Sequence, residues 1–328
     1  DLILFKRTKF KNSQFLNLIT SLLIFILSFA LMHSEAMSVE CKTSNNTSSC
    51  DVTTAKTQPI GKFTGSKSLT VNFQADVIAR INHLINVDAT NASNIFTNFQ
   101  TIKNTQLSSG NAIYITGTIN LLENEGTIES TGAGTLNQGI RLYNGTLNTL
   151  ENSGKIEGNN DYAISLEGIS TVGTITNENT GDIYALLNTT TSTIGSIENR
   201  GNILASSSNN KGAITNFSNI KGITLIRNDG NITAFNSTSN YGIYNNNAKI
   251  TTIENNGTIS SAYASGDIYN NNGTIETLIN GQGGSDALVF RGNLPTNYEI
   301  KISNTDYGKL EGFRIGSGTI NFSINEDS

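Results

Sequence analysis

Apolar and polar residues alternate over short distances along most of this 328-residue chain, and Gly or Asn interrupts the alternation every few residues. None of the short pieces reaches the roughly ten to twelve residues of 3.6-residue periodicity that indicate a helix. The pattern therefore predicts short β-strands separated by tight turns. Representative strand-like pieces are Asn111–Tyr114, Gly139–Leu142, Tyr162–Leu166, Gly212–Ile214 and Tyr241–Tyr244.

One seven-residue block recurs, with an apolar residue first, Asn third, Gly fifth and Ile seventh. A longer copy at Ile175–Ile183 carries two extra residues, and a degenerate copy ends at Ile275. Consecutive block glycines lie between 16 residues (257 to 273) and 29 residues (201 to 230) apart, so the repeat varies in length. The regular copies are Leu122–Ile128, Leu150–Ile156, Ile197–Ile203, Ile226–Ile232 and Ile253–Ile259.

A unit of about three short strands cannot bury its apolar residues alone, whereas stacked units enclose a continuous core. We therefore predict an all-β fold, a right-handed parallel β-helix (solenoid) of about ten coils and about 50 Å at one strand spacing per coil. Equivalent apolar residues are expected to lie above one another inside it. A second apolar line is expected three residues before each block, at Ile119 or Leu147, Val172, Ile194, Ile223 and Ile250.

The asparagine of each block is predicted to point inward, where its side-chain amide hydrogen-bonds to the next along the axis, as in the amide ladders of stacked sheets. The glycine two residues later is expected to supply the positive φ of a sharp corner. The predicted ladder comprises Asn124, Asn152, Asn177, Asn199, Asn228 and Asn255. The residues before them are expected to form an outward row, namely Glu123, Glu151, Thr176, Glu198, Arg227 and Glu254.

The chain is expected to divide into four segments. Residues 1–36 form a signal peptide, residues 37–60 a polar lead-in, residues 61–280 the repeat solenoid, and residues 281–328 C-terminal coils of different pattern. Within the solenoid, Phe63–Leu107 alternates well but lacks the Asn-x-Gly corner, as expected of atypical capping coils.

The N-terminal segment has the three-part layout of a secretory signal peptide. Basic residues cluster within Lys6–Lys11, an apolar run follows at Phe15–Leu31, and Ser34 and Ala36 supply small residues for cleavage after Ala36. The apolar run is expected to be helical. An uncleaved membrane anchor is the alternative, because about 18 apolar residues can span a bilayer. The chain opens on Asp1 rather than Met, which indicates a fragment or a mis-set start.

The chain contains two cysteines, Cys41 and Cys50, just after the predicted cleavage site. In an exported chain such a close pair is expected to form a small disulfide loop that pins the mature N-terminus. Lipid modification of Cys41 is the alternative, although Ser38–Glu40 matches a lipoprotein signal poorly. A metal site is disfavoured, because the one downstream histidine, His83, has no partner pattern and is expected to be a partly exposed strand residue.

Charge narrows the choice of partners. Only 14% of the residues are charged, where soluble domains average about 25%. The net charge is −5 and the pI is near 5.2, so the surface cannot neutralise a phosphate backbone and no nucleic-acid partner is expected. No cofactor is expected either, because the sequence has no Walker-type phosphate loop and no nucleophile elbow.

The main enzymatic alternative is a β-helical polysaccharide lyase or hydrolase, since hydrolysis needs two carboxylates about 5 to 9 Å apart. Stacked Glu123 and Glu151 would meet this distance, but their Thr, Asn and Ser neighbours favour a solvated row, so no catalytic residue is assigned. Gly283–Leu288 resembles part of a calcium nonapeptide, yet its single incomplete copy favours a tight turn. Asn231 and Asn256 lie in acidic Asp/Glu-x-Asn-x-Thr patterns and are candidate glycosylation sites, which intact mass would reveal.

The blocks resemble the Ile-Glu-Asn-x-Gly-Thr-Ile repeats of adhesin-like passenger domains of Gram-negative type V autotransporters. The resemblance covers roughly residues 110–328 and includes the transition Gly283–Asn293. It implies an outer-membrane β-barrel translocator as a C-terminal partner, and the sequence to Ser328 does not include one. A truncated chain or an interrupted reading frame is therefore expected.

The same resemblance implies an exported protein at the cell surface or outer membrane, or in the extracellular medium. Its expected function is non-enzymatic adhesion to a host-cell or extracellular-matrix receptor. Recognition is expected in loops that differ between repeats, such as Ser206–Lys211 and Asn236–Asn240. The carbohydrate-active β-helix enzyme remains the alternative, and a purely structural passenger is a third possibility.

Overall fold

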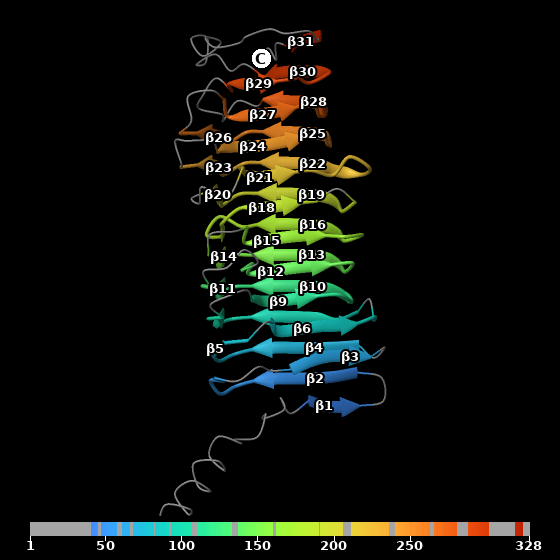
Figure 1. Cartoon of the computed structure of the whole chain (residues 1–328), viewed down its shortest axis with the longest axis vertical. Coiled ribbons are helices and arrows are strands. Elements are labelled where there is room, and N and C mark those ends of the chain that lie inside the picture. The colour runs from blue at the N-terminus through green and yellow to red at the C-terminus, as the bar shows by residue number, and fades with distance from the viewer. Residues whose placement is uncertain are drawn as a thin grey trace, which may run out of the picture. The chain divides into compact units, whose positions relative to one another are not determined.

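The three strands of each repeat unit stack on those of neighbouring units and form three sheets around a common core (Figure 1). The structure is a computed structural model. The predicted signal peptide and its helix lie outside the residues that it describes. Those residues are 41–44, 47–57, 61–65, 68–81, 83–91, 93–106, 110–132, 137–159, 162–189, 191–205, 211–235, 240–262, 266–280, 288–301 and 319–323.

Sheet A contains 13 of the described strands, sheet B contains eight and sheet C contains ten. Sheet A consists of β1 (Cys41–Ser44), β2 (Thr47–Val52), β4 (Ser68–Phe73), β7 (Ile95–Asn98), β10 (Thr118–Asn124), β13 (Thr146–Asn152), β16 (Thr171–Asn177), β19 (Thr193–Asn199), β22 (Gly222–Asn228), β25 (Lys249–Asn255), β28 (Thr274–Asn280), β30 (Asn297–Lys301) and β31 (Thr319–Ser323). Sheet B consists of β5 (Val77–Ala79), β8 (Thr101–Asn104), β11 (Thr127–Ser130), β14 (Lys155–Gly158), β17 (Asp182–Ile183), β20 (Asn202–Ala205), β23 (Asn231–Ala234) and β26 (Thr258–Ser261). Sheet C consists of β3 (Gly61–Gly65), β6 (His83–Ala89), β9 (Asn111–Ile115), β12 (Ile140–Tyr143), β15 (Ile164–Glu167), β18 (Leu186–Asn188), β21 (Gly212–Asn216), β24 (Tyr241–Asn246), β27 (Ile268–Asn271) and β29 (Phe290–Gly292).

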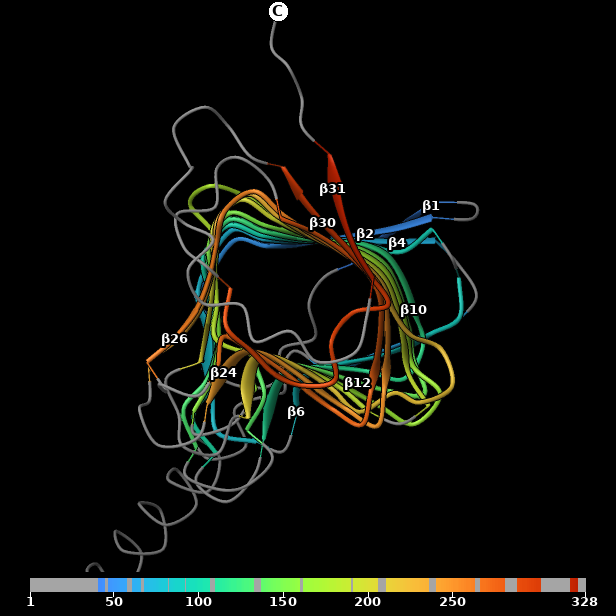
Figure 2. The ribbon, with the colours of Figure 1, turned by 90° about the horizontal axis from the view of Figure 1, so that it is seen from above.

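Each coil passes from sheet C to sheet A to sheet B, and eight coils, from β3–β5 to β24–β26, contribute a strand to every sheet. Seen with the C-terminal coils nearest the viewer, the chain runs counter-clockwise as it rises, which makes the coil right-handed (Figure 2). The predicted all-β parallel solenoid is therefore confirmed, with eight complete coils among the described residues where about ten were expected. β1, β2 and β27–β31 add incomplete coils at the two ends.

The core consists of apolar side chains that lie in register along the axis. On sheet A, the line that begins with Ile119 and Leu147 continues through paired residues to Ile275. On sheet B, the block-ending isoleucines pair from Ile102 to Ile259. Every residue in these two lines is 0–1% exposed. The predicted stacking of equivalent apolar residues is confirmed.

The block asparagines form a continuous hydrogen-bonded ladder at the end of sheet A. Each Nδ2 donates to the Oδ1 of the next asparagine at 2.7–2.8 Å, and the amides therefore all point the same way along the axis. All six predicted rungs are 0–1% exposed. The ladder extends beyond the predicted set by one residue at each end. Its members are Asn98, Asn124, Asn152, Asn177, Asn199, Asn228, Asn255 and Asn280.

The six rungs from Asn98 to Asn228 also tie the corner between sheets A and B to the backbone. The Nδ2 of Asn199 donates to the carbonyl oxygen of Gly201 in its own coil at 3.2 Å, and to that of Asn231 in the next coil at 3.1 Å. A buried asparagine with these bonds fixes both the angle of the corner and the register of two coils. A one-residue slip would expose the asparagines and bury the charged outward row.

A second ladder, which the block did not predict, lies at the opposite corner, where sheet C leads into sheet A. Its rungs are Asn188, Asn216, Asn245 and Asn270, joined by bonds of 2.8–2.9 Å. In the coil before Asn188, the paired position is occupied by Leu166. The second ladder therefore reinforces only the later coils.

Glycine is required at the block corners because a Cβ would clash with neighbouring backbone, and not because the backbone there has a positive φ. None of the block glycines has a positive φ, so the predicted positive φ is wrong. A Cβ added at Gly201 would lie 2.2 Å from the backbone oxygen of Glu178 and 2.3 Å from that of Gly181. Positive φ occurs instead at turns from sheet C into sheet A, at Asn144, Gly168, Asn247 and Asn272.

At the N-terminal end, β1 and β2 form an antiparallel hairpin in which Cys41 lies directly opposite Cys50. Cys50 is disulfide-bonded and buried at 0% exposure. Because β2 pairs with β4, this hairpin continues sheet A. The disulfide of Cys50 therefore lies in the hairpin that precedes the first complete coil, which is where a disulfide loop was expected.

Asn199→Leu is expected to lower the free energy of unfolding by about 2–4 kcal/mol. Leu has a similar volume, but it removes the partner of the Asn177 amide and leaves Oδ1 of Asn228 without its donor. Urea denaturation measures the loss. Asn148→Leu is the control, since Asn148 is exposed on β13, and its stability should stay within about 0.5 kcal/mol of the parent. Equal stability of Asn199→Leu and the parent would contradict the ladder.

Gly201→Ala and Gly201→Asn are both expected to cost about 1–3 kcal/mol, because either Cβ meets the backbone of the coil below. If positive φ were the reason for glycine, Asn would be tolerated better than Ala. Asn247 provides the comparison, since its φ is 49°. There, glycine should be a better substitute than alanine. Thermal denaturation of the four variants decides between the two explanations.

Candidate functional site

The outer face of sheet C presents two neighbouring lines of side chains, because residues between the core positions point outward. Both lines mix aromatic, amide, hydroxyl and charged groups. The central row contains Asn86, Tyr114, Arg141, Ser165, Leu187, Thr215, Tyr244, Tyr269 and Arg291, which pair in register from strand to strand. The flanking row, two residues further along each strand, contains Asp88, Thr116, Tyr143, Glu167, Thr189, Phe217, Asn246 and Asn271.

In the earlier coils, the rings of His83 and Tyr114 and the guanidinium of Arg141 pack together across three strands. The imidazole of His83 stacks on the ring of Tyr114, with centroids 4.1 Å apart and an interplanar angle of 11°. Asn111 lies beside them, and its Nδ2 is 3.2 Å from Nδ1 of His83. The guanidinium of Arg141 lies 5.7 Å from the centre of the Tyr114 ring. Burial, and then the positive charge of Arg141, lower the pKa of His83 below its ordinary value.

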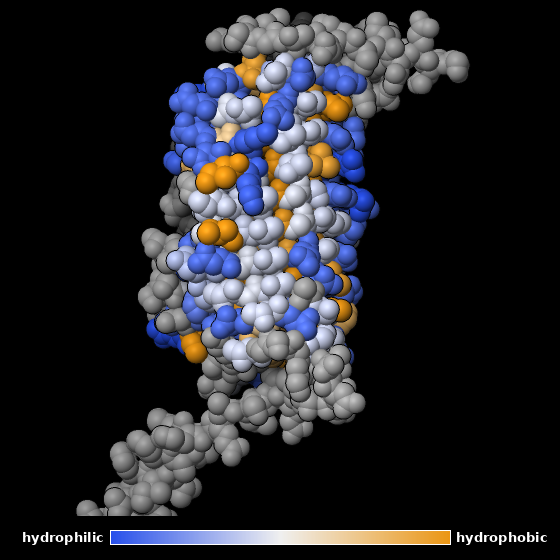
Figure 3. All heavy atoms as spheres, turned by 90° about the vertical axis from the view of Figure 1, so that its right-hand side faces the viewer, coloured by the Kyte–Doolittle hydropathy of each residue, from blue (hydrophilic) through white to orange (hydrophobic). Residues whose placement is uncertain are grey.

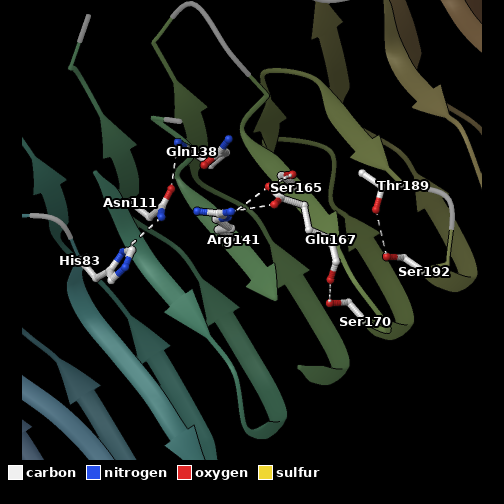
Figure 4. Close-up of polar contacts among 9 residues, drawn as sticks. All are labelled: His83, Asn111, Gln138, Arg141, Ser165, Glu167, Ser170, Thr189 and Ser192. Atoms are coloured by element: carbon white, nitrogen blue, oxygen red, sulfur yellow. Dashed lines mark hydrogen bonds and ion pairs between the residues drawn. The ribbon is translucent and has the colours of Figure 1, made fainter. Parts of the chain in front are cut away.

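Arg141 is held by a two-point ion pair with Glu167 on the next coil (Figure 4). Its Nε donates to Oε1 of Glu167 at 3.0 Å, and its Nη2 donates to Oε2 at 2.6 Å. The hydroxyl of Ser165 donates to the same carboxylate at 3.2 Å. Such bidentate pairs fix the guanidinium plane. The planar face of Arg141 is therefore oriented beside the rings of Tyr114 and Tyr143, the latter at 5.8 Å.

In the later coils, four aromatic rings from three consecutive strand regions form a cluster. The rings of Tyr244 and Tyr269 lie 5.4 Å apart, and Tyr241 packs on Tyr269 at 4.9 Å. Phe217 meets Tyr244 edge-on at 5.9 Å. Tyr241 is 5% exposed and packs against both Tyr244 and Tyr269, while Tyr244, Tyr269 and Phe217 are partly exposed. We refer to these four residues as the tyrosine cluster.

The outer faces of sheets A and B carry charges that pair along the axis. Arg227 stands in register between Glu198 and Glu254, as expected, and donates to Oε2 of Glu254 at 2.8 Å. Lys103 forms a similar pair with Glu129 at 3.2 Å on sheet B. Exposed pairs of this kind contribute only about 0–1 kcal/mol each. On these solvated faces Arg227 and Lys103 each neutralise a stacked glutamate, whereas Glu123 and Glu151 stack as like charges.

The spacing of carboxylates on sheet C differs from that of a glycoside hydrolase. The two rows contain two described acids, Asp88 and Glu167, which are separated by three strand spacings, or about 14 Å. Paired catalytic carboxylates lie about 5 to 9.5 Å apart. On sheet A, Glu123 and Glu151 do pair in register, as expected of any stacked row.

The side of the solenoid at which sheet C turns into sheet A is mainly polar, with scattered apolar side chains (Figure 3). Two of these side chains are large and exposed, Ile169 at 75% and Ile220 at 66%. They lie in different turns. In this view no continuous apolar surface covers the turns.

The structure describes the surroundings of only some of the other predicted sites. Asn231 and Asn256 are exposed, and their amides donate to Asn202 and Asp229 at 2.9 and 2.8 Å, so glycosylation there remains a prediction. Residues 206–210 and 236–239 of the predicted recognition loops lie outside the described residues, as do residues 283–287 of the calcium-like motif.

Sequence reasoning missed the sheet C site because its residues come from different repeats. His83 and Tyr114 are 31 residues apart and meet only when the coil length is known. A usable signal was present, since Tyr244 and Tyr269 each stand directly before an asparagine of the second ladder. Aligning the repeats on that asparagine would have stacked the two tyrosines.

Among the described residues, no group of three or more His, Cys, Asp or Glu side chains could hold a metal ion. Within the same part of the chain, no helix is long and apolar enough to cross a membrane. No protein-family model matches the chain, and searches of curated proteins and of solved structures returned no similar protein.

His83 provides a local test of the sheet C geometry, because a His33→Asn variant leaves it as the single histidine. Its pKa, followed by NMR, should lie below 6.5, and Arg141→Gln should raise it by removing a nearby positive charge. The lowered pKa favours the neutral imidazole in the folded state. Its contribution to stability is therefore present above pH 6.5 and is lost as the pH falls below that value. Arg200→Gln, at a distant corner, is the control, and an unchanged pKa in Arg141→Gln would contradict the contact.

Proposed function

We propose that this chain is the passenger region of an autotransporter, exported to the cell surface, where it acts as an adhesin and not as an enzyme. The observation that carries the proposal is the outer face of sheet C. It is an in-register surface of exposed or partly exposed Tyr, Arg, Asn and Thr side chains on a rigid column, with Ser165 and Thr215 buried between them. Tyrosine and arginine are the side chains most enriched at binding hot spots.

The scaffold suits such a role. Eight asparagines joined by hydrogen bonds and fully buried apolar lines hold the coils in fixed register. The surface is therefore organised before a partner arrives, which reduces the entropy lost on binding. Adhesion by a preformed surface requires no moving parts and no catalytic group.

Export is supported by two features of the N-terminal region. The basic, apolar and small-residue segments before residue 37 have the layout of a signal peptide. Cys50 is disulfide-bonded, and disulfides form and persist in oxidising compartments outside the cytoplasm. The repeat blocks, which resemble those of autotransporter passengers, extend the proposal from export to surface display.

The proposal is tested by comparing binding and hydrolysis with the same purified protein. Binding to host cells and to extracellular-matrix components is expected, with no release of reducing sugar from a panel of polysaccharides. Tyr143→Ser should weaken the binding severalfold, because Tyr143 is 43% exposed on the flanking row. Phe99→Ser should not, since Phe99 has a similar exposure of 41% but lies at the corner between sheets A and B.

Sugar release without binding would support the β-helical carbohydrate-active enzyme instead. Equal loss of binding in Tyr143→Ser and Phe99→Ser would show that the effect does not come from sheet C.

A further inference from the structure

The tyrosine cluster is held in place by polar contacts on each side of its rings. Arg291 donates from Nη1 to the hydroxyl of Tyr241 at 2.7 Å, and its guanidinium carbon lies 4.7 Å from the centre of the Tyr269 ring. The hydroxyl of Tyr269 donates to Oδ1 of Asn271 at 3.1 Å. Asn271 in turn donates from Nδ2 to Asn246 at 2.6 Å. These contacts leave the rings little freedom to collapse onto one another.

Beside the cluster, the described positions of the two rows carry amides and hydroxyls and no acid. The carboxylate of Asp267, two residues before Tyr269, accepts hydrogen bonds from the backbone nitrogens of Ser261 and Val289. From Leu187 to Arg291, neither the central nor the flanking row contains Asp or Glu, and all of these row positions are described. The groups beside the rings are the side chains of Asn246 and Asn271. Both an amide oxygen and an amide nitrogen are therefore available in a fixed orientation.

We propose that the tyrosine cluster binds an oligosaccharide, with sugar rings stacked on Tyr244 and Tyr269. This inference rests on the adhesin function proposed above and specifies the chemistry of its ligand. The C–H faces of a pyranose are apolar and flat, and they match the exposed face of an aromatic ring. The hydroxyl groups around the sugar both donate and accept hydrogen bonds, as do the neighbouring asparagine amides.

The repeat of the solenoid also suits a linear sugar chain. Tyr244 and Tyr269 occupy the same position in consecutive coils, and their ring centres lie 5.4 Å apart with the ring planes tilted by 45°. One sugar in an extended glycan advances by a similar distance. A glycan lying along the axis would therefore present one ring to each tyrosine in turn.

A protein partner is less well matched to this surface. Stable protein interfaces bury about 800 Å² per partner around a well-packed apolar centre. Here three partly exposed rings are bordered by short polar side chains that are also partly exposed, Thr189 and the two asparagines. A ligand with small apolar faces and many hydroxyls can stack on the rings and also hydrogen-bond to these polar side chains. A cluster of apolar side chains from a protein could not form those hydrogen bonds.

The test is binding of the purified full-length protein to an array of neutral and anionic oligosaccharides, beside binding to host cells. The parent protein should bind a subset of the glycans, and Tyr244→Ala/Tyr269→Ala should bind them about tenfold or more weakly. Tyr269→Phe keeps the ring and loses only the bond to Asn271, so most of the affinity should remain. Phe99→Ala is the matched control and should bind as the parent does. Circular dichroism and melting temperature confirm that each variant is folded.

The outcomes separate this inference from the adhesin function. Loss of glycan binding in the double variant, with Phe99→Ala unchanged, supports the tyrosine site. Glycan binding that survives in the double variant overturns the site but leaves adhesion standing. Cell binding that persists after periodate oxidation of surface glycans, with no binding on the array, also overturns the site alone. Absence of both cell and glycan binding contradicts the adhesin function and the site together.

Discussion

A buried asparagine amide on seven of the eight complete coils fixes the register on which the rest of the solenoid depends. The strands are only two to seven residues long, so no single strand pair has enough bonds to prevent slippage. Each of the six rungs from Asn98 to Asn228 bonds to the next rung and to the backbone of its own and the following coil, as Asn199 does. In a low-dielectric interior, an amide without these partners would be strongly destabilising. The native register is the one that satisfies all of them.

Fixed register turns the outer faces into ordered surfaces. Once the core residues are stacked, each outward position forms a line along the axis, and its chemistry depends on the residue that each repeat supplies. On sheets A and B these lines contain paired charges, as between Arg227 and Glu254. On sheet C they bring together His83, Tyr114 and Arg141 in the early coils, and the tyrosine cluster in the later ones.

Most of the scaffold was predictable, because every repeat must bury its apolar residues and hydrogen-bond its buried asparagine in the same way. The block predicted both apolar lines and six of the eight rungs of the first ladder. Asn98 was missed because Gln100 occupies the place of the corner glycine, and Asn280 because no apolar residue closes its block. The corner glycines were predicted, but for a positive φ that they do not have. They are needed because the backbone of the coil below approaches too closely for a Cβ, and this contact between repeats cannot be read from one repeat. The contacts of His83, Tyr114 and Arg141 were not predictable, because coil length varies and sets which side chains meet. The stacking of Tyr244 on Tyr269 could have been found by aligning the repeats on the asparagine that follows each tyrosine.

The measurement that tests the ladder most directly is hydrogen exchange of the asparagine side-chain amides, followed by NMR. The Nδ2 protons of Asn152, Asn177, Asn199 and Asn228 should exchange only when coils unfold, because each is buried and bonded to the next coil. Those of Asn148, which is exposed and bonded to the side chain of exposed Asn120, should exchange much faster. Equally fast exchange at Asn148 and at the four rungs would contradict the ladder, and with it the fixed register of the sheet C surface.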